Sequence, residues 1–156
     1  MADRGQPLIY FDANPFMYAF ESGPELAEPV LALIRALESK PGLGVTSELV
    51  LGELLAPTRK PNAIPTWRKR RIYLSLLVFN TFFDLRPVTR EVIIETATLR
   101  EHANLKLVDA IHMVTAIHAG CRYFLSNDRD MERRPEGMRI VQPDASGVEL
   151  LLRELA

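Results

Sequence analysis

Residues 107–131 constrain the fold more than any other part of the chain. Apolar residues recur there at three- and four-residue spacing from Leu107 to Ile117, which predicts an amphipathic helix ending at Gly120. A short apolar run at residues 123–125 follows and has the length and aromatic content of a buried strand. This succession of helix, tight turn and strand is typical of an α/β protein with a mostly parallel central sheet.

Two acids mark the ends of this unit. Asp109 lies in the first turn of the predicted helix, and Asp128 follows the predicted strand. In a βαβ arrangement the helices run antiparallel to the strands, so helix starts and strand ends lie at the same edge of the sheet. We therefore expect Asp109 and Asp128 to meet at the carboxyl edge, where open parallel sheets place their functional sites.

The rest of the chain repeats this alternation. Further strands are predicted at residues 8–11, 43–46, 84–88 and 139–141, with helices between them, one of which runs from about residue 67 to residue 83. With 156 residues, 47% of them hydrophobic, the chain can bury one substantial core, so a single domain is expected over residues 1–156, with residues 1–6 flexible.

Composition also limits the surroundings and the partners. The single cysteine, Cys121, can form no internal disulfide, and no apolar segment has the form of a signal peptide or membrane anchor, so we expect a cytoplasmic protein. The net charge of −1 provides no general attraction for nucleic acid. A polyanionic partner would therefore need a local basic patch or a metal ion.

Acids at other predicted strand ends and helix starts complete a candidate site. Asp12 follows the first strand, and Glu48 and Glu53 lie on the helix that Ser47 caps. These two glutamates are separated by about 140° around a helix, so they cannot both point at one spot. Asp130 is an alternative to Asp128 as the acid contributed by the last part of the site.

Carboxylates gathered in this way need a counterion. At a separation of about 4 Å, each pair repels by about 4 kcal/mol at an effective dielectric constant of 20. Arg129 is the one cation at a matching position, and no Cys or His set has ligand spacing. A hard divalent cation with oxygen ligands, Mg²⁺ or Mn²⁺, is the natural counterion, and it indicates metal-assisted phosphoryl hydrolysis.

Four segments in this order resemble the acidic motifs of PIN-domain ribonucleases, and most closely the VapC-type toxins of type II toxin–antitoxin pairs. These segments are residues 8–14, 47–54, 109–112 and 124–130. The resemblance implies a three-layer α/β/α sandwich around a parallel sheet and an endoribonuclease that uses Mg²⁺ or Mn²⁺. It also implies a homodimer and a small antitoxin protein that blocks the site.

The resemblance can be transferred position by position. It implies that the catalytic, metal-binding acids are Asp12, Glu53, Asp109 and Asp128, with Asp130 as the extra metal ligand of some members. Asn14 and Ser126 match polar positions that orient those acids. The presence of both Glu48 and Glu53 is a departure from the family pattern, although the context Gly52-Glu53-Leu54 matches it better.

Residues outside the acid set carry weaker signals. His112 lies one turn after Asp109 and could hold that carboxylate by a hydrogen bond, although single histidines on helices are mostly structural. A basic run covers almost a full helical turn near Trp67 and could contact RNA phosphates or an antitoxin tail, or simply form a solvated surface. The run comprises Arg68, Lys69, Arg70 and Arg71, with Arg59 and Lys60 shortly before it.

Other classes of protein fit these residues less well than a metal-dependent endoribonuclease does. A receiver-type phosphoacceptor would need adjacent acids after the first strand and a lysine after a late strand. A haloacid-dehalogenase-like phosphatase would need Asp-x-Asp where this chain has Asp12-x-Asn14. A PIN-like module that binds RNA or protein without cleaving it is the alternative from a different class, and the presence of all four acids argues against it.

Overall fold

The computed structural model describes residues 6–132 and 137–156. At its centre is a parallel sheet of five strands in the order β3-β2-β1-β4-β5. Each strand expected from the sequence is confirmed to within two residues at either end. The strands are β1 (Ile9–Phe11), β2 (Gly44–Ser47), β3 (Phe83–Arg86), β4 (Tyr123–Leu125) and β5 (Arg139–Val141).

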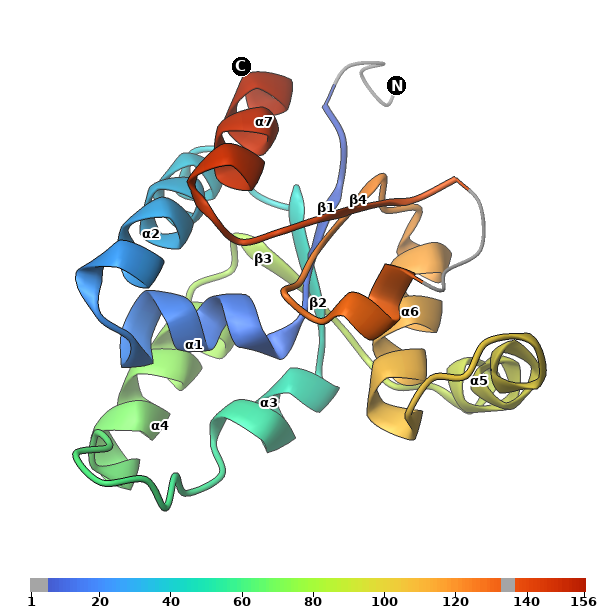
Figure 1. Cartoon of the computed structure of the whole chain (residues 1–156), viewed down its shortest axis with the longest axis horizontal. Helices are drawn as coiled ribbons and strands as arrows, with labels where there is room; N and C mark the ends of the chain where they lie inside the picture. Colours follow the sequence, from blue (N-terminus) through green and yellow to red (C-terminus); the bar gives the residue numbers. More distant parts are fainter. Residues whose placement is uncertain (1–5, 133–136) are drawn as a thin grey trace.

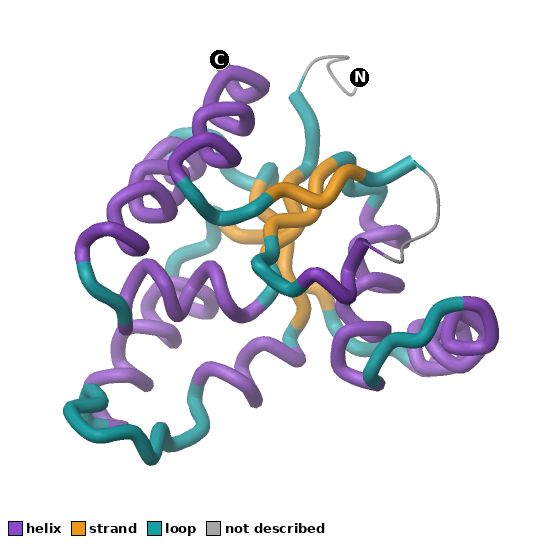
Figure 2. Tube along the Cα trace, in the orientation of Figure 1, coloured by secondary structure: helices purple, strands orange, loops and turns teal. Residues whose placement is uncertain are grey.

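Helices cover both faces of this sheet, and the expected α/β/α sandwich is confirmed (Figure 1). One face carries α1 (Ala13–Glu21), α2 (Pro24–Glu38), α3 (Leu49–Leu54), α4 (Thr66–Leu74) and α7 (Ala145–Leu155). The other face is covered by α6 (Leu107–Ala119), against which α5 (Arg90–His102) packs. Figure 2 shows the strands enclosed by these helices and their loops.

Alternation along the strands separates two hydrophobic cores. In β1, Ile9 and Phe11 pack into the core beneath α1 and α2, whereas Tyr10 packs towards α6. In β4, Phe124 likewise faces α6 while its two neighbours face the first core. Successive strand side chains point to opposite faces, so a strand covered on both sides must be apolar throughout. This explains the uninterrupted apolar runs in the sequence.

The helix expected from about residue 67 to residue 83 is too long at its end, because helical structure stops at Phe79. Helix α4 ends at Leu74, a π-helical turn η1 (Ser75–Phe79) follows, and the chain then turns into β3. Phe82 and Phe83 are buried, and the ring of Phe83 packs edge-on against Phe11 in the core. The apolar pattern continues across the turn because both segments contribute to one core, and no Gly or Pro at residues 80–82 marks the boundary.

Lys69 lies inside the protein, so the expectation of a surface role is wrong for this member of the basic run. Its side chain donates hydrogen bonds to the Ala56 carbonyl (2.8 Å) and the Thr58 hydroxyl (2.6 Å) and lies 3.4 Å from the Glu21 carboxylate. Burial of a charge is favourable only with such partners. Lys69 therefore ties the loop after α3 to α1 and α4, and the exposed members of the run are Arg68, Arg70 and Arg71.

The start of the chain, the single cysteine and the helices were also the subject of sequence expectations. Gln6 donates a side-chain hydrogen bond to the Leu155 carbonyl (3.0 Å), and the rest of the segment expected to be flexible lies outside the described residues. Burial raises the pKa of the Cys121 thiol to about 12, which is typical of a structural cysteine. Among the described residues, no helix has the length and apolar character needed to span a membrane.

Candidate metal centre

The candidate site lies where β1 and β4 end side by side. Phe11 pairs with Leu125 in the sheet register, and the backbone amide of Asp12 donates to the Leu125 carbonyl (3.2 Å). The residues that follow the two strands are therefore neighbours. The chain begins the sheet at β1 and adds β2 and β3 on one side of it. It then crosses over and adds β4 on the other side, so the strand order reverses between β1 and β4, where the candidate site lies.

Asp12 is buried and held from several directions. Its carboxylate accepts hydrogen bonds from the Ala13 amide (2.8 Å), the Ser126 hydroxyl (2.9 Å) and the Asn14 side chain (3.3 Å). Asn14 is fixed in turn, because its oxygen accepts from the Asn127 amide (3.1 Å). Burial raises the pKa of Asp12, while His112 and the hydrogen bonds from Ala13 and Ser126 partly offset this. Asn14 and Ser126 thus occupy positions from which they orient this acid.

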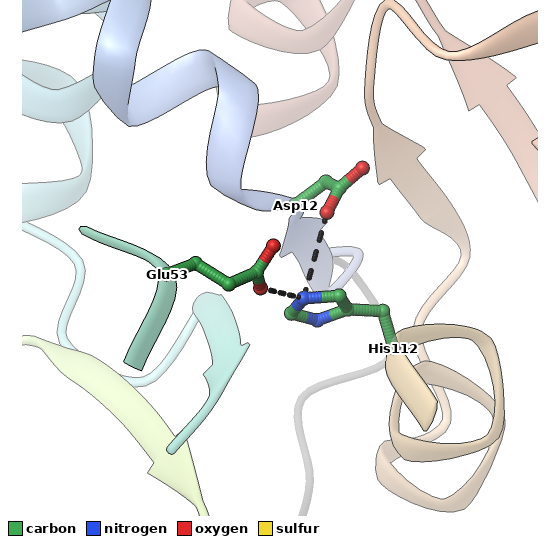
Figure 3. A group of neighbouring side chains, drawn as sticks. All are labelled: Asp12, Glu53 and His112. Carbon is green, nitrogen blue, oxygen red and sulfur yellow. Dashed lines mark hydrogen bonds and ion pairs between the residues drawn. The ribbon is translucent and has the colours of Figure 1, made fainter. Parts of the chain in front are cut away.

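His112 lies between Asp12 and Glu53 (Figure 3). Its Nε2 is 2.5 Å from Glu53 Oε1 and 3.6 Å from Asp12 Oδ1, and its Nδ1 is 2.6 Å from the Tyr10 hydroxyl. The expectation that His112 holds Asp109 is wrong, because the imidazole points across to the sheet and α3. The sequence contains a signal for this position, because His112 stands among the mostly apolar residues 110–116. In the structure, this segment of α6 is buried.

The charge state of His112 follows from these neighbours. Burial lowers the pKa of His112, but the hydrogen bond with Glu53 and the negative charges of Asp12, Glu53 and Asp109 raise it more, and the net pKa lies above the usual value. The negative charges around His112 therefore favour its protonated form. Sequence reasoning named His112 only as a partner of Asp109, so its position between Asp12 and Glu53 was not predicted.

Asp109 and Asp128 share the electrostatic environment of this pocket. The pKa of Asp109 is raised to about 6 by burial and then by the negative charges of Asp128 and Asp12. The backbone amide of Asp128 donates to Ser126 Oγ (3.0 Å), and one Asp128 oxygen accepts from the Asp130 amide (2.9 Å). The side chain of Asp130 is exposed on the short helix η2 (Arg129–Glu132).

The donor atoms fit a hard divalent cation. Within the described parts of the chain, one group of three residues brings potential ligand atoms within 4.8 Å of one another, namely Asp12, Glu53 and His112. Two of these three residues offer carboxylate oxygens, and Asp109 and Asp128 contribute further negative charge nearby. Oxygen ligands of this kind suit Mg²⁺ or Mn²⁺. Glu48, by contrast, is exposed on the neighbouring turn, as expected for the glutamate that points away.

Fold and site together define a class of protein: an α/β/α sandwich with an acidic pocket at the carboxyl edge of a parallel sheet. The model of the PIN domain matches residues 9–137. The chain therefore belongs to the PIN-domain family, as its four acidic segments indicated. Among curated proteins, none matches this chain.

Three solved structures have a similar fold. A chain of a toxin–antitoxin complex from Klebsiella pneumoniae is 21% identical with a TM-score of 0.61, and the match covers 86% of this chain and 97% of that one. A chain of VapBC2 from Rickettsia felis, bound to a promoter DNA fragment, is 15% identical with a TM-score of 0.63, covering 86% and 98%. A chain of FitAB bound to the IR36 DNA fragment is 16% identical with a TM-score of 0.62, covering 87% and 95%.

Asp109→Asn should raise the melting temperature of the metal-free protein at pH 8. The native pKa of Asp109, about 6, exceeds the ordinary carboxyl pKa. The wild type therefore loses stability as the pH rises towards 6 and keeps the full penalty above it. Because water partly screens this half-buried carboxylate, we expect a gain of about 2–4 °C, which corresponds to about 1 kcal/mol. Calorimetry in EDTA between pH 4 and pH 8 measures it.

The pH dependence distinguishes this cause from a general effect of the substitution. The difference in melting temperature should be largest above pH 6 and should disappear near pH 4. The control variant Glu48→Gln removes an exposed acid from the adjacent turn and should leave the melting temperature nearly unchanged. A less stable Asp109→Asn protein at pH 8 would contradict the assignment of repulsion to this pocket.

Proposed function

We propose that this protein is a metal-dependent endoribonuclease that hydrolyses RNA phosphodiester bonds. The supporting observation is the convergence of acids from four separate segments on one edge of the sheet. Asp12 and Glu53 lie on either side of His112, and the pKa of Asp109 is raised by burial and then by the charges of Asp128 and Asp12. Folding does not require this arrangement, because like charges in a partly buried pocket destabilise the native state.

The proposed roles follow from the positions of the side chains. Asp12, Glu53, Asp109 and Asp128 are the catalytic acids that hold Mg²⁺ or Mn²⁺, and Asp130 is close enough in the chain to extend the ligand set. When bound, the ion supplies positive charge to the phosphodiester and lowers the pKa of water at the site. Asn14 and Ser126 keep Asp12 in one orientation through their hydrogen bonds.

An RNA strand that reaches these acids has a path beside α3. A cavity of about 770 Å³ borders Glu53 and Asn14 and is otherwise formed largely by the loop at residues 56–64 and by α1. Arg59 and Lys60 on this loop are exposed and can contact phosphates. Tyr18 lines the same cavity and offers an aromatic ring on which a base can stack. Lys69, buried beneath, holds the loop in place.

We propose further that the protein is the toxin of a type II toxin–antitoxin pair acting in the cytoplasm. Two chains of similar fold come from a toxin–antitoxin complex and from VapBC2, which supports this assignment. A groove of about 570 Å³ between α2 and α4 is lined by apolar side chains, by Trp67 and by Arg68 and Arg71. Its apolar character favours an antitoxin segment over RNA at this part of the basic run.

Homodimer formation is part of the same proposal. Apolar side chains lie exposed on the outer surfaces of α5 and α6, on the side of the molecule away from α1 and α2. Exposed apolar side chains that gather on one side of a protein are typical of protein interfaces. The residues are Ile93, Ile94, Leu107, Val108 and Ile117.

Purified protein should cleave single-stranded RNA in the presence of Mg²⁺ and lose this activity in EDTA. Asp109→Asn should lower the rate at least about 100-fold, because a metal ion stabilises the transition state by several kcal/mol. Glu48→Gln serves as the control and should keep near wild-type activity. Cleavage that survives both chelation and Asp109→Asn would contradict the proposal, and RNA binding without cleavage would indicate a PIN-like binding module.

The same variants separate a toxin from a housekeeping nuclease. Expression of the wild type should arrest bacterial growth, and Asp109→Asn should relieve the arrest at equal protein levels. Normal growth with an active wild-type enzyme would contradict the assignment as a toxin while leaving the nuclease activity in place.

Replacement of both Arg59 and Lys60 by Ala should weaken RNA binding and reduce its salt dependence. Each lost phosphate contact on a single strand lowers the slope of log K against log salt by about 0.7, so the pair should lower it by about 1.4. Fluorescence anisotropy with single-stranded RNA in an Asp109→Asn background measures binding without cleavage. The control pair Lys40→Ala and Arg139→Ala lies at the opposite, amino edge of the sheet. An equal loss of RNA affinity in the control double variant would contradict the proposed RNA path along the loop.

A further inference from the structure

We propose that His112 is a positioning residue that holds the Glu53 carboxylate towards Asp12, with the Tyr10 hydroxyl fixing the imidazole from the sheet side. This inference rests on the proposed metal site and adds a residue outside its set of acids. The contacts form a continuous chain from the core to the pocket: Tyr10 Oη to Nδ1 at 2.6 Å and Nε2 to Glu53 Oε1 at 2.5 Å.

The imidazole is held rigidly at both ends. His112 is fully buried, and its ring packs edge-on against Tyr10, which in turn stacks on Phe124 of the neighbouring strand with ring centroids 4.9 Å apart. Two strands of the sheet therefore determine where Nε2 points. A donor fixed in this way can transmit the geometry of the sheet to a more mobile side chain.

Glu53 is the acid that requires such support. It has a longer side chain than the aspartates, its side chain is 27% exposed, and it lies on a helix of six residues. Among the described residues, His112 is the hydrogen-bond donor to its carboxylate, whereas Asp12 accepts hydrogen bonds from three residues. Without His112, the Glu53 carboxylate would lose this orientation.

The same contacts argue against His112 as a metal ligand. One ring nitrogen faces Tyr10 and the other faces Glu53, so coordination through either nitrogen requires an existing hydrogen bond to break. The geometry instead matches a residue that contacts a ligand and orients it. Substitution of such a residue commonly costs about 10–100-fold in metal affinity.

Binding of Mn²⁺ to the intact protein, measured by electron paramagnetic resonance, tests this role. His112→Leu should weaken Mn²⁺ binding about 10–100-fold. His112→Gln, which can still donate a hydrogen bond, should recover part of the loss. The milder Tyr10→Phe, which removes only the supporting hydroxyl, should weaken binding less. His118→Leu is the matched control, because His118 lies on the same helix and contacts the exposed Glu95 outside the pocket.

Electron spin echo spectroscopy of the Mn²⁺ complex separates positioning from coordination. We expect no directly coordinated nitrogen in the wild type. A coordinated imidazole signal that disappears in His112→Leu would overturn the proposal, as would unchanged Mn²⁺ affinity in that variant.

A measurement on the metal-free protein separates failure of this inference from failure of the proposed function. The proton on His112 Nε2, which is hydrogen-bonded to Glu53, should give a downfield, slowly exchanging NMR resonance that is lost in Glu53→Ala. Absence of this resonance in the wild type would overturn the positioning role. Its presence in a protein that fails to bind Mn²⁺ would support the His112–Glu53 contact and refute the metal-dependent function.

Discussion

Repulsion between carboxylates is the constraint on which the rest of this structure depends. The fold brings acids from β1, α3, α6 and the loop after β4 to one edge of the sheet. Carboxylates that lie close together repel one another, and this repulsion opposes folding. Such a pocket persists only if the remaining structure compensates for it. The pKa values of Asp12 and Asp109 are raised first by burial and then by neighbouring carboxylates, which are Glu53 for Asp12 and Asp128 and Asp12 for Asp109.

The compensation takes two forms in the metal-free protein. Hydrogen-bond donors surround Asp12, and the His112 imidazole lies between Asp12 and Glu53, whose charges favour its protonated form. Both depend on the sheet, because Ser126 is set beside Asp12 by the pairing of β1 with β4, and His112 is set by Tyr10. Neither supplies enough charge to balance four carboxylates, and this is the physical basis of the proposed affinity for a divalent cation.

Much of the fold could be predicted because its three central strands, β1, β2 and β4, are buried on both faces. The apolar runs of β1 and β4 and the alternation of strands and helices placed Asp12, Asp109 and Asp128 at one edge of the sheet. The limit of helix α4 could not be predicted, since the apolar pattern continues through the π-helical turn into Phe83 without a breaking residue. A pattern based on one strand or helix at a time cannot distinguish two adjacent segments that face the same core.

The site was only partly accessible from the sequence for a related reason. Helical spacing relates His112 to Asp109, but the contacts of His112 come from Tyr10 and Glu53, which are 102 and 59 positions away. The burial of Lys69 likewise depends on Glu21 and on the loop after α3. Contacts between residues this far apart in the sequence form only when the chain packs, so helical spacing within one sequence cannot predict them.

We propose that the crowded acids at the carboxyl edge hold a divalent cation. This can be tested by anomalous X-ray diffraction from crystals grown with Mn²⁺, with data collected on both sides of the manganese absorption edge. We expect an anomalous peak bounded by the carboxylates of Asp12, Glu53, Asp109 and Asp128. Saturating Mn²⁺ with no peak at this edge of the sheet, or with peaks only at other positions, would contradict it.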